Sequence, residues 1–141
     1  MRLTVVLDVN ILASAAVSEN GLPRVVVRKG LQKKYRLVSS RHIFKKLDDT
    51  FQKPYFAARL TQQARKDYLA LLEEKSQREA PDPTVRGVAP DLEDDLVLGT
   101  VVAAQADVLV TGDKGLLDLG EYRGVRIVTA AQFLDMIGTV V

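Results

Sequence analysis

The stretch VVLDVN, residues 5–10, decides the fold, because it joins the end of a buried strand to two polar side chains. Its apolar residues form a short, partly β-branched run without helical periodicity, which is typical of a strand covered on both faces. Asp8 follows directly, and a carboxylate is costly to bury there unless a cation or hydrogen bonds meet it. We therefore interpret Asp8 as a candidate functional residue. We expect Asn10 to cap the next helix and so to fix the turn at Asp8.

A second stretch, DVLVTGD at residues 107–113, repeats this pattern of an apolar run, a small turn and an aspartate. Along the chain such strands alternate with helical patterns. The expected strands are 3–7, 35–40, 107–113 with its turn, and 125–129, and residues 80–90 are expected to form a loop, with a short strand at 85–88 as the alternative. The expected helices are 11–17, 23–34, 41–53, 61–79, 91–105, 114–119 and 130–138. Alternation of this kind predicts an α/β fold with a parallel sheet covered on both sides. Because ligands bind outside the carboxyl ends of such strands, Asp8 and Asp113 are expected at the functional edge.

Composition narrows the class of protein. A chain of 141 residues favours one domain, residues 1–141, and 47% hydrophobic with 27% charged residues is ordinary for a globular protein. The absence of cysteine excludes disulfides and thiolate metal sites. The N-terminus is a poor signal peptide, and no stretch approaches the ~20 apolar residues of a membrane span, so we expect a cytoplasmic protein.

Charge is unevenly distributed, although the net charge is only +2. Basic residues concentrate in residues 24–53, whereas an acidic cluster, DLEDD, occupies residues 91–95. This arrangement could hold a polyanion beside a cation site, and the alternative is a set of solvated helix faces. The only histidine, His42, is expected at the surface.

Several carboxylates are expected to converge at one edge of the sheet. Asp8 and Asp113 end two strands, and Asp94 and Asp95 lie in the first turn of a helix, where acidic residues are also favoured by the helix dipole. Oxygen ligands without cysteine suit Mg²⁺ or Mn²⁺ rather than zinc. A metal-bound water is a nucleophile, and phosphodiesters are its usual electrophile.

Three stretches together resemble the PIN domain family, and more narrowly the VapC-like toxins of prokaryotic toxin–antitoxin systems. They are VVLDVNILASA (5–15), DLEDDLVLGTVVAAQADVLVTGDKGLL (91–117) and VRIVTAAQFL (125–134). The resemblance covers nearly the whole chain in the right order. It implies a three-layer α/β/α fold around a parallel sheet. It also implies an endoribonuclease that hydrolyses RNA with a Mg²⁺- or Mn²⁺-activated water, and an antitoxin protein as partner.

The family's site residues are carried over position by position. The aspartates that match its catalytic and metal-binding positions are Asp8, Asp95 and Asp113. The residues that match supporting positions beside them are Asn10, Asp94 and Thr111.

One position departs from the family. PIN nucleases usually carry a glutamate in the helix after the second strand, and here Lys46 takes its place. Helix 41–53 contains no glutamate, and Asp49, one turn further on, is the candidate substitute. The ammonium of Lys46 could pair with Asp8 or Asp113, occupy the cation's place and impair metal binding and catalysis. The alternative is that Lys46 points to solvent.

Two other functions compete with the ribonuclease. A catalytically degenerate PIN module would bind RNA or an antitoxin without cleavage, which Lys46 favours and the three aspartates oppose. A phosphoacceptor domain is disfavoured because no acidic residue follows Asp8 until Glu19, and because YRLVSS (35–40) ends without aspartate. We also predict a homodimer, from the apolar character of residues 11–17 and 25–27.

Overall fold

The computed structural model describes residues 2–89 and 91–138, and a six-stranded sheet lies at its centre. The ends of the predicted domain, residue 1 and residues 139–141, lie outside this range. The strands follow the spatial order β3 (Gln77–Arg78), β2 (Arg36–Ser39), β1 (Thr4–Leu7), β4 (Val108–Val110), β6 (Val125–Val128) and β5 (Glu121–Tyr122). All neighbouring pairs are parallel except β5 with β6. The predicted α/β fold with a parallel sheet is confirmed.

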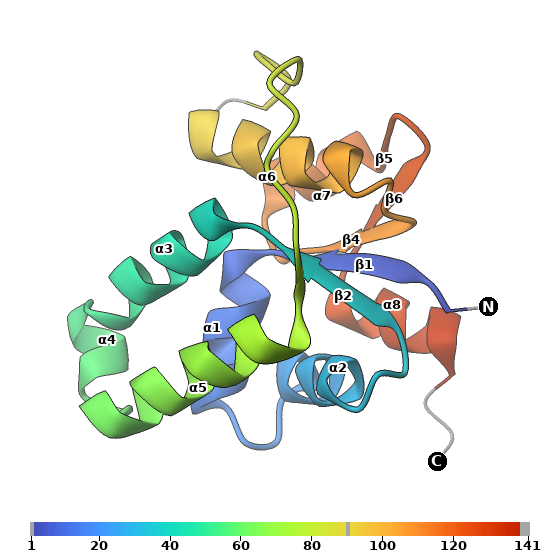
Figure 1. Cartoon of the computed structure of the whole chain (residues 1–141). Coiled ribbons are helices and arrows are strands. Elements are labelled where there is room, and N and C mark those ends of the chain that lie inside the picture. The colour runs from blue at the N-terminus through green and yellow to red at the C-terminus, as the bar shows by residue number, and fades with distance from the viewer. Residues whose placement is uncertain (1, 90, 139–141) are drawn as a thin grey trace.

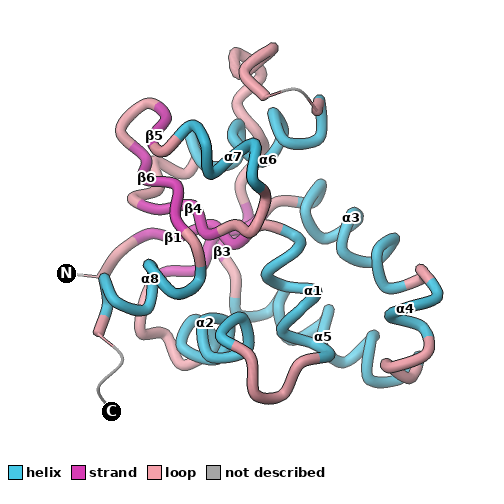
Figure 2. The backbone as a smooth tube through the Cα atoms, turned by 180° about the vertical axis from the view of Figure 1, so that it is seen from behind, coloured by secondary structure: helices cyan, strands magenta, loops and turns pink. Residues whose placement is uncertain are grey.

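Helices cover both faces of this sheet (Figures 1 and 2). On one side lie α6 (Leu92–Ala103) and α7 (Lys114–Leu119). On the other lie α1 (Val9–Val17), α2 (Leu22–Leu31), α5 (Gln62–Lys75) and α8 (Ala130–Ile137). Helix α3 (Arg41–Phe51) packs against α1 and α5 and is followed by the short α4 (Pro54–Ala57). Covered on both faces, the two central strands are mostly apolar, as the sequence predicted; the exception is Thr4 at the start of β1.

The register of the central strands brings their carboxyl ends to one edge. Leu7 lies beside Val110, and Val6 lies beside both Val38 and Leu109. In β1, Val5, Val6 and Leu7 are at most 1% exposed, so this strand is locked between its neighbours. The residues that follow the central strands, among them Asp8 and Thr111, therefore emerge close together.

Several predicted boundaries hold because local capping determines them. The predicted starts of α3, α5, α6 and α8 agree with the structure to within one residue, and at each of them a side chain accepts a backbone hydrogen bond as the N-cap; these residues are Ser40, Thr61, Asp91 and Thr129. The cap of α1 is Asp8, however, and the predicted capping role of Asn10 is wrong.

Other boundaries were wrong. The helix expected over 61–79 ends at Lys75, and residues 77–78 form the edge strand β3 beside β2. Residues 85–88 belong to the predicted loop, and the alternative of a short strand there is wrong. The sequence did not predict α4 or β5. A two-residue strand forms because a neighbouring strand offers it hydrogen bonds. Such a strand is too short to show a periodic pattern in the sequence.

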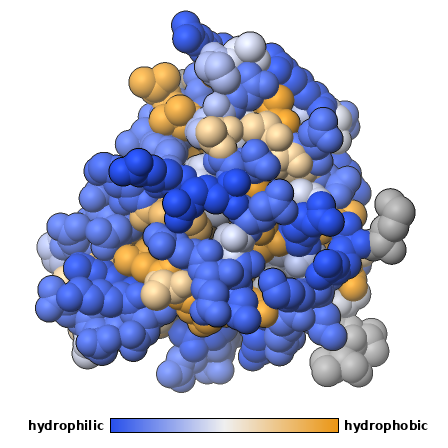
Figure 3. All heavy atoms as spheres, in the orientation of Figure 1, coloured by the Kyte–Doolittle hydropathy of each residue, from blue (hydrophilic) through white to orange (hydrophobic). Residues whose placement is uncertain are grey.

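Most apolar residues of the segments on which the predicted homodimer rested are buried, and Ala16, Val17 and Val25 are half-buried. Ile11, Leu12, Val26 and Val27 are all buried in the core, because α1 and α2 pack on the sheet and on each other. In Figure 3, the visible face is mostly hydrophilic, and apolar residues appear in small separate groups. None of the helices in the described part of the chain is long and apolar enough to cross a membrane.

Candidate functional site

A cleft of about 360 Å³ opens at the carboxyl ends of β1 and β4. Its walls come from the first two turns of α1, from α3 and α4, and from the starts of α6 and α7. The side chains and backbone that line it belong to Asp8, Val9, Asn10, Ala13, Ser14, Lys46, Thr50, Lys53, Phe56, Asp91, Glu93, Asp94 and Asp113. Five of these residues are acidic and two are lysines.

Asp8 lies at the base of the cleft and is only 7% exposed. Its Oδ1 accepts a hydrogen bond from the backbone N–H of Val9 at 2.7 Å, and its Oδ2 accepts one from the hydroxyl of Thr111 at 2.7 Å. Burial raises the pKa of Asp8, and the charge of Asp113 raises it further, whereas the bonds from Thr111 and Val9 lower it. The carboxylate is thus held in one orientation in an environment that disfavours its negative charge.

Thr111 ties the two strand ends together. Its hydroxyl donates to Asp8, and its oxygen accepts the backbone N–H of Asp113 at 3.0 Å. Asn10 accepts the N–H of Gly112 at 3.2 Å, and Asp113 caps α7 by accepting the N–H of Leu116 at 2.9 Å. The structure therefore brings together four of the residues proposed from sequence: Asp8, Asn10, Thr111 and Asp113.

Asp94, and not Asp95, faces the cleft. The carboxylate of Asp95 accepts backbone N–H groups from the loop before α6, from Gly87 at 2.8 Å, Val88 at 3.1 Å and Ala89 at 2.8 Å. These bonds lower the pKa of Asp95. The expectation that Asp95 contributes to the cleft is therefore wrong: the loop binds its carboxylate, and it is absent from the cleft lining.

Asp94 is partly buried among several like charges in the cleft. Its pKa is raised to about 6, first by burial and then by the charges of Asp113, Asp8, Asp91 and Glu93. A carboxyl group surrounded by like charges loses its proton reluctantly, and a cation placed among the same groups would remove that cost.

Lys46 forms an ion pair with Glu93, which spans from α3 to α6. The side chains are 36% and 46% exposed, and the neighbouring carboxylate raises the pKa of Lys46. The expected pairing of Lys46 with Asp8 or Asp113 is wrong, and so is the alternative that it points only to solvent. Sequence reasoning missed Glu93, although its place in the first turn of an acidic helix was the available signal.

Asp49 does not take the place of the missing glutamate. Its carboxylate pairs with Lys45 at 3.2 Å on the exposed side of α3, outside the cleft lining. His42 is half-buried and lines an adjoining depression with Lys46 and Glu93. The carboxylate that approaches Lys46 thus comes from α6.

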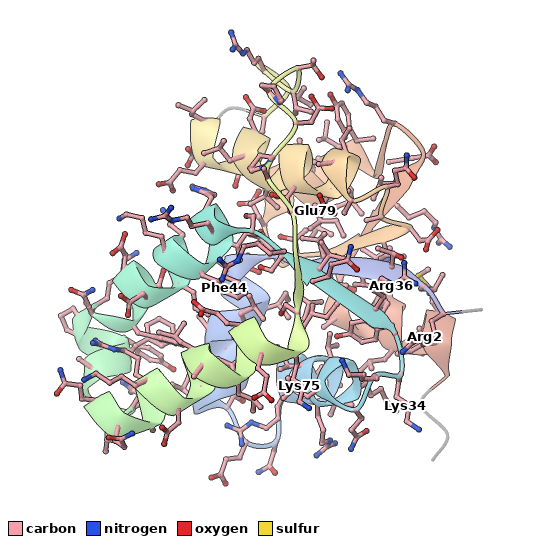
Figure 4. All side chains as sticks on the ribbon, viewed as in Figure 1. Arg2, Lys34, Arg36, Phe44, Lys75 and Glu79 are labelled. Carbon is pink, nitrogen blue, oxygen red and sulfur yellow. The ribbon has the colours of Figure 1, made fainter. Side chains whose placement is uncertain are left out.

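The basic residues of 24–53 do not all approach the acidic cleft. Lys46 and Lys53 face the acidic cleft, as one of the two readings of the charge pattern expected. Lys34 and Arg36 lie near the start of β2, at the opposite edge, together with Arg2 and Lys75 from outside this segment (Figure 4). Only part of the basic segment therefore approaches the carboxylates.

The donor set of the cleft fits a divalent cation in its chemistry. Asp8, Asp94 and Asp113 offer oxygen ligands, and the pKa of Asp94 is raised first by burial and then by the charges of Asp113 and Asp8. Within residues 2–89 and 91–138, no three acidic or histidine side chains are already gathered tightly enough to hold an ion. Asp8, Asp94 and Asp113 are the residues that would hold it.

The chain is similar to one known protein family. The profile of a family described as "PIN domain" matches residues 4–115. No curated protein matches the chain.

Two solved structures have a similar fold. PAE2754 from Pyrobaculum aerophilum superposes with a TM-score of 0.67 at 16% identity, covering 96% of this chain and 89% of that one. VapBC2 from Rickettsia felis, solved with a DNA fragment from its promoter, gives a TM-score of 0.65 at 13% identity, covering 90% of this chain and 98% of that one. At these identities the similarity establishes the fold alone.

Proposed function

The chain belongs to the PIN domain family, and on this premise we propose that it is a metal-dependent endoribonuclease of the VapC-like toxin type. PIN domains are generally nucleases that use divalent metal ions. The observation that carries the proposal is the meeting of Asp8, Asp94 and Asp113 in one cleft at the strand ends. We take residues 1–141 as one such domain.

The roles of the residues follow from their contacts. Bound Mg²⁺ or Mn²⁺ would supply a Lewis acid and an activated water for attack on an RNA phosphate. Thr111 holds the Asp8 carboxylate in place and also binds the N–H of Asp113, so that both acids keep a defined position. Asp94 takes the helix-borne position that the family resemblance first assigned to Asp95. Lys53 offers a positive charge to the phosphate backbone at the other end of the cleft.

The ion pair of Lys46 with Glu93 favours an active nuclease over a catalytically degenerate PIN module. Because Glu93 neutralises the ammonium, Lys46 does not have to pair with the three aspartates. The second candidate is a degenerate PIN module that binds RNA or an antitoxin without cleaving. The observation that favours it is the lack, among the described residues, of a ready cluster of three ligands.

We also propose two protein partners. The similarity to VapBC2 supports an antitoxin that binds this chain. A homodimer stays a proposal, although the structure buries most of the apolar surface first invoked for it. Sedimentation at tens of micromolar tests it, and a clean monomer would refute it.

Cleavage of single-stranded RNA by the purified chain, with Mn²⁺ or Mg²⁺ and then with EDTA, tests the function. We expect metal-dependent cleavage that Asp8→Asn, Asp94→Asn and Asp113→Asn each abolish. Asp95→Asn is the matched control, because it neutralises an adjacent carboxylate outside the cleft. Metal-dependent binding of RNA without cleavage would support the degenerate module, and cleavage that persists in EDTA would contradict the proposal.

A further inference from the structure

The cleft continues beyond its acidic end. Lys46, Thr50 and Lys53 follow one another along one side of α3 and its C-terminal end, and Phe56 of α4 completes the wall. Lys46 and Lys53 are seven positions apart, which corresponds to about 10 Å along a helix. The cleft is therefore acidic at the strand ends and basic and aromatic at α4.

An ordered aromatic platform adjoins this basic end. Tyr55 is 55% exposed, and the guanidinium carbon of Arg59 lies 3.8 Å from the centre of its ring. Arg59 is fixed there, because its Nη1 donates to the backbone oxygen of Tyr55 at 2.8 Å. The Tyr55 ring meets Phe56 edge to face at 5.1 Å, and Phe56 packs in turn on the buried Phe51 at 5.8 Å.

The charges on this platform have no acidic partner in the described part of the chain. Its five ion pairs there include neither Lys53 nor Arg59. Two ion pairs that involve the adjoining helices α3 and α5, Lys45 with Asp49 and Arg65 with Asp48, join opposite charges to each other. A cationic and aromatic surface remains for an anionic ligand that has a flat ring.

We propose that this end of the cleft is a nucleotide subsite, in which a base of single-stranded RNA stacks on the Tyr55–Arg59 pair and Lys53 contacts a phosphate. The inference rests on the proposed function and adds the residues that hold the substrate beside the site of cleavage. Aromatic rings interleaved with cations are the usual means of binding single strands, because every base has a stacking face. A duplex does not fit this mode, because its bases are stacked on one another.

RNA binding without catalysis tests the subsite. Fluorescence anisotropy of labelled oligoadenosine with the full chain in EDTA measures affinity when no cleavage occurs. We expect Tyr55→Ala to weaken binding about 5- to 150-fold, the change that corresponds to ~1–3 kcal/mol per stacked base. Tyr55→Trp should retain affinity. Lys53→Gln should reduce the slope of log affinity against log salt by about one phosphate contact.

Tyr122→Ala is the matched control, because Arg123 lies 5.2 Å over the Tyr122 ring on β5, away from the cleft lining. Thermal melting verifies that each variant is folded. Equal losses in Tyr55→Ala and Tyr122→Ala, no loss in either, or no RNA binding by the wild type would overturn the subsite. Loss of a dimer in Tyr55→Ala with unchanged RNA affinity would also overturn it, by showing a protein contact. A wild type that never cleaves, but loses RNA affinity through Tyr55→Ala alone, would refute the nuclease and support the subsite.

Discussion

Replacing Lys46 by glutamine is expected to raise the affinity of the cleft for Mn²⁺ by about 5- to 30-fold. The change removes one positive charge from the cleft lining and frees the Glu93 carboxylate. Both effects increase the negative potential around Asp8, Asp94 and Asp113. Glutamine keeps much of the length and polarity of lysine, so that packing along α3 changes little.

The magnitude follows from the exposure of Lys46 and from an assumed separation between its ammonium and an ion in the same cleft. A unit charge and a divalent ion ~8 Å apart interact by about 4 kcal/mol at an effective dielectric constant of ~20, and by about 1 kcal/mol in water. The Lys46 side chain is 36% exposed, so solvent screening brings the change to ~1–2 kcal/mol. The cost in stability is small, because half-exposed ion pairs contribute at most about 1 kcal/mol.

Calorimetric titration with Mn²⁺ at neutral pH measures the effect, and Lys45→Gln is the control. Lys45 is the neighbouring residue on α3 and is also ion-paired, with Asp49, but it lies outside the cleft lining. Equal affinities in the wild type and both variants would refute the reasoning, because the ammonium of Lys46 would then not act on the ion. Lys46→Glu should gain more than Lys46→Gln only if the new carboxylate itself joins the site.

Three further predictions concern stability and pH. Asp95→Asn should lower the free energy of unfolding by about 1.5–3 kcal/mol, because it weakens the hydrogen bonds to residues 87–89, and it should leave the Mn²⁺ affinity unchanged. Urea unfolding measures the stability, and a loss of Mn²⁺ affinity without a loss of stability would contradict the prediction. Since the pKa of Asp94 rises from 3.8 to about 6 on folding, stability due to this group should fall as pH rises through that window, by at most about 3 kcal/mol. Urea midpoints should show that Asp94→Asn reduces the slope of stability against pH, to which Asp8, whose pKa is also raised, contributes as well; a slope equal to that of the wild type would assign all of it to other groups. Gly30→Ala should destabilise the fold by ~1–3 kcal/mol, because the added Cβ would lie 2.7 Å from the Tyr35 hydroxyl; an unchanged melting temperature would show that Tyr35 moves aside freely.

Much of the edge that carries the site could be predicted from local sequence. Apolar runs that end in Asp8 and Asp113, separated by helical segments, imply parallel strands with both acids at one edge. This inference depends only on periodicity and strand polarity, and the register of β1 beside β4 confirms the geometry. Helix starts at Ser40, Thr61, Asp91 and Thr129 were predictable for the same reason, since a cap interacts with residues two or three positions away.

The orientation of side chains on α6 was decided only by the tertiary structure. Adjacent residues on a helix point about 100° apart, so sequence alone does not say whether Asp94 or Asp95 faces the cleft. The packing of α6 on the sheet and the backbone N–H groups of residues 87–89 determine that rotation. The pairing of Lys46 with Glu93 joins residues 47 positions apart, and it exists because folding places α3 beside α6. Local patterns report interactions along the chain, whereas the charge balance of this cleft depends on segments that only the assembled core brings together.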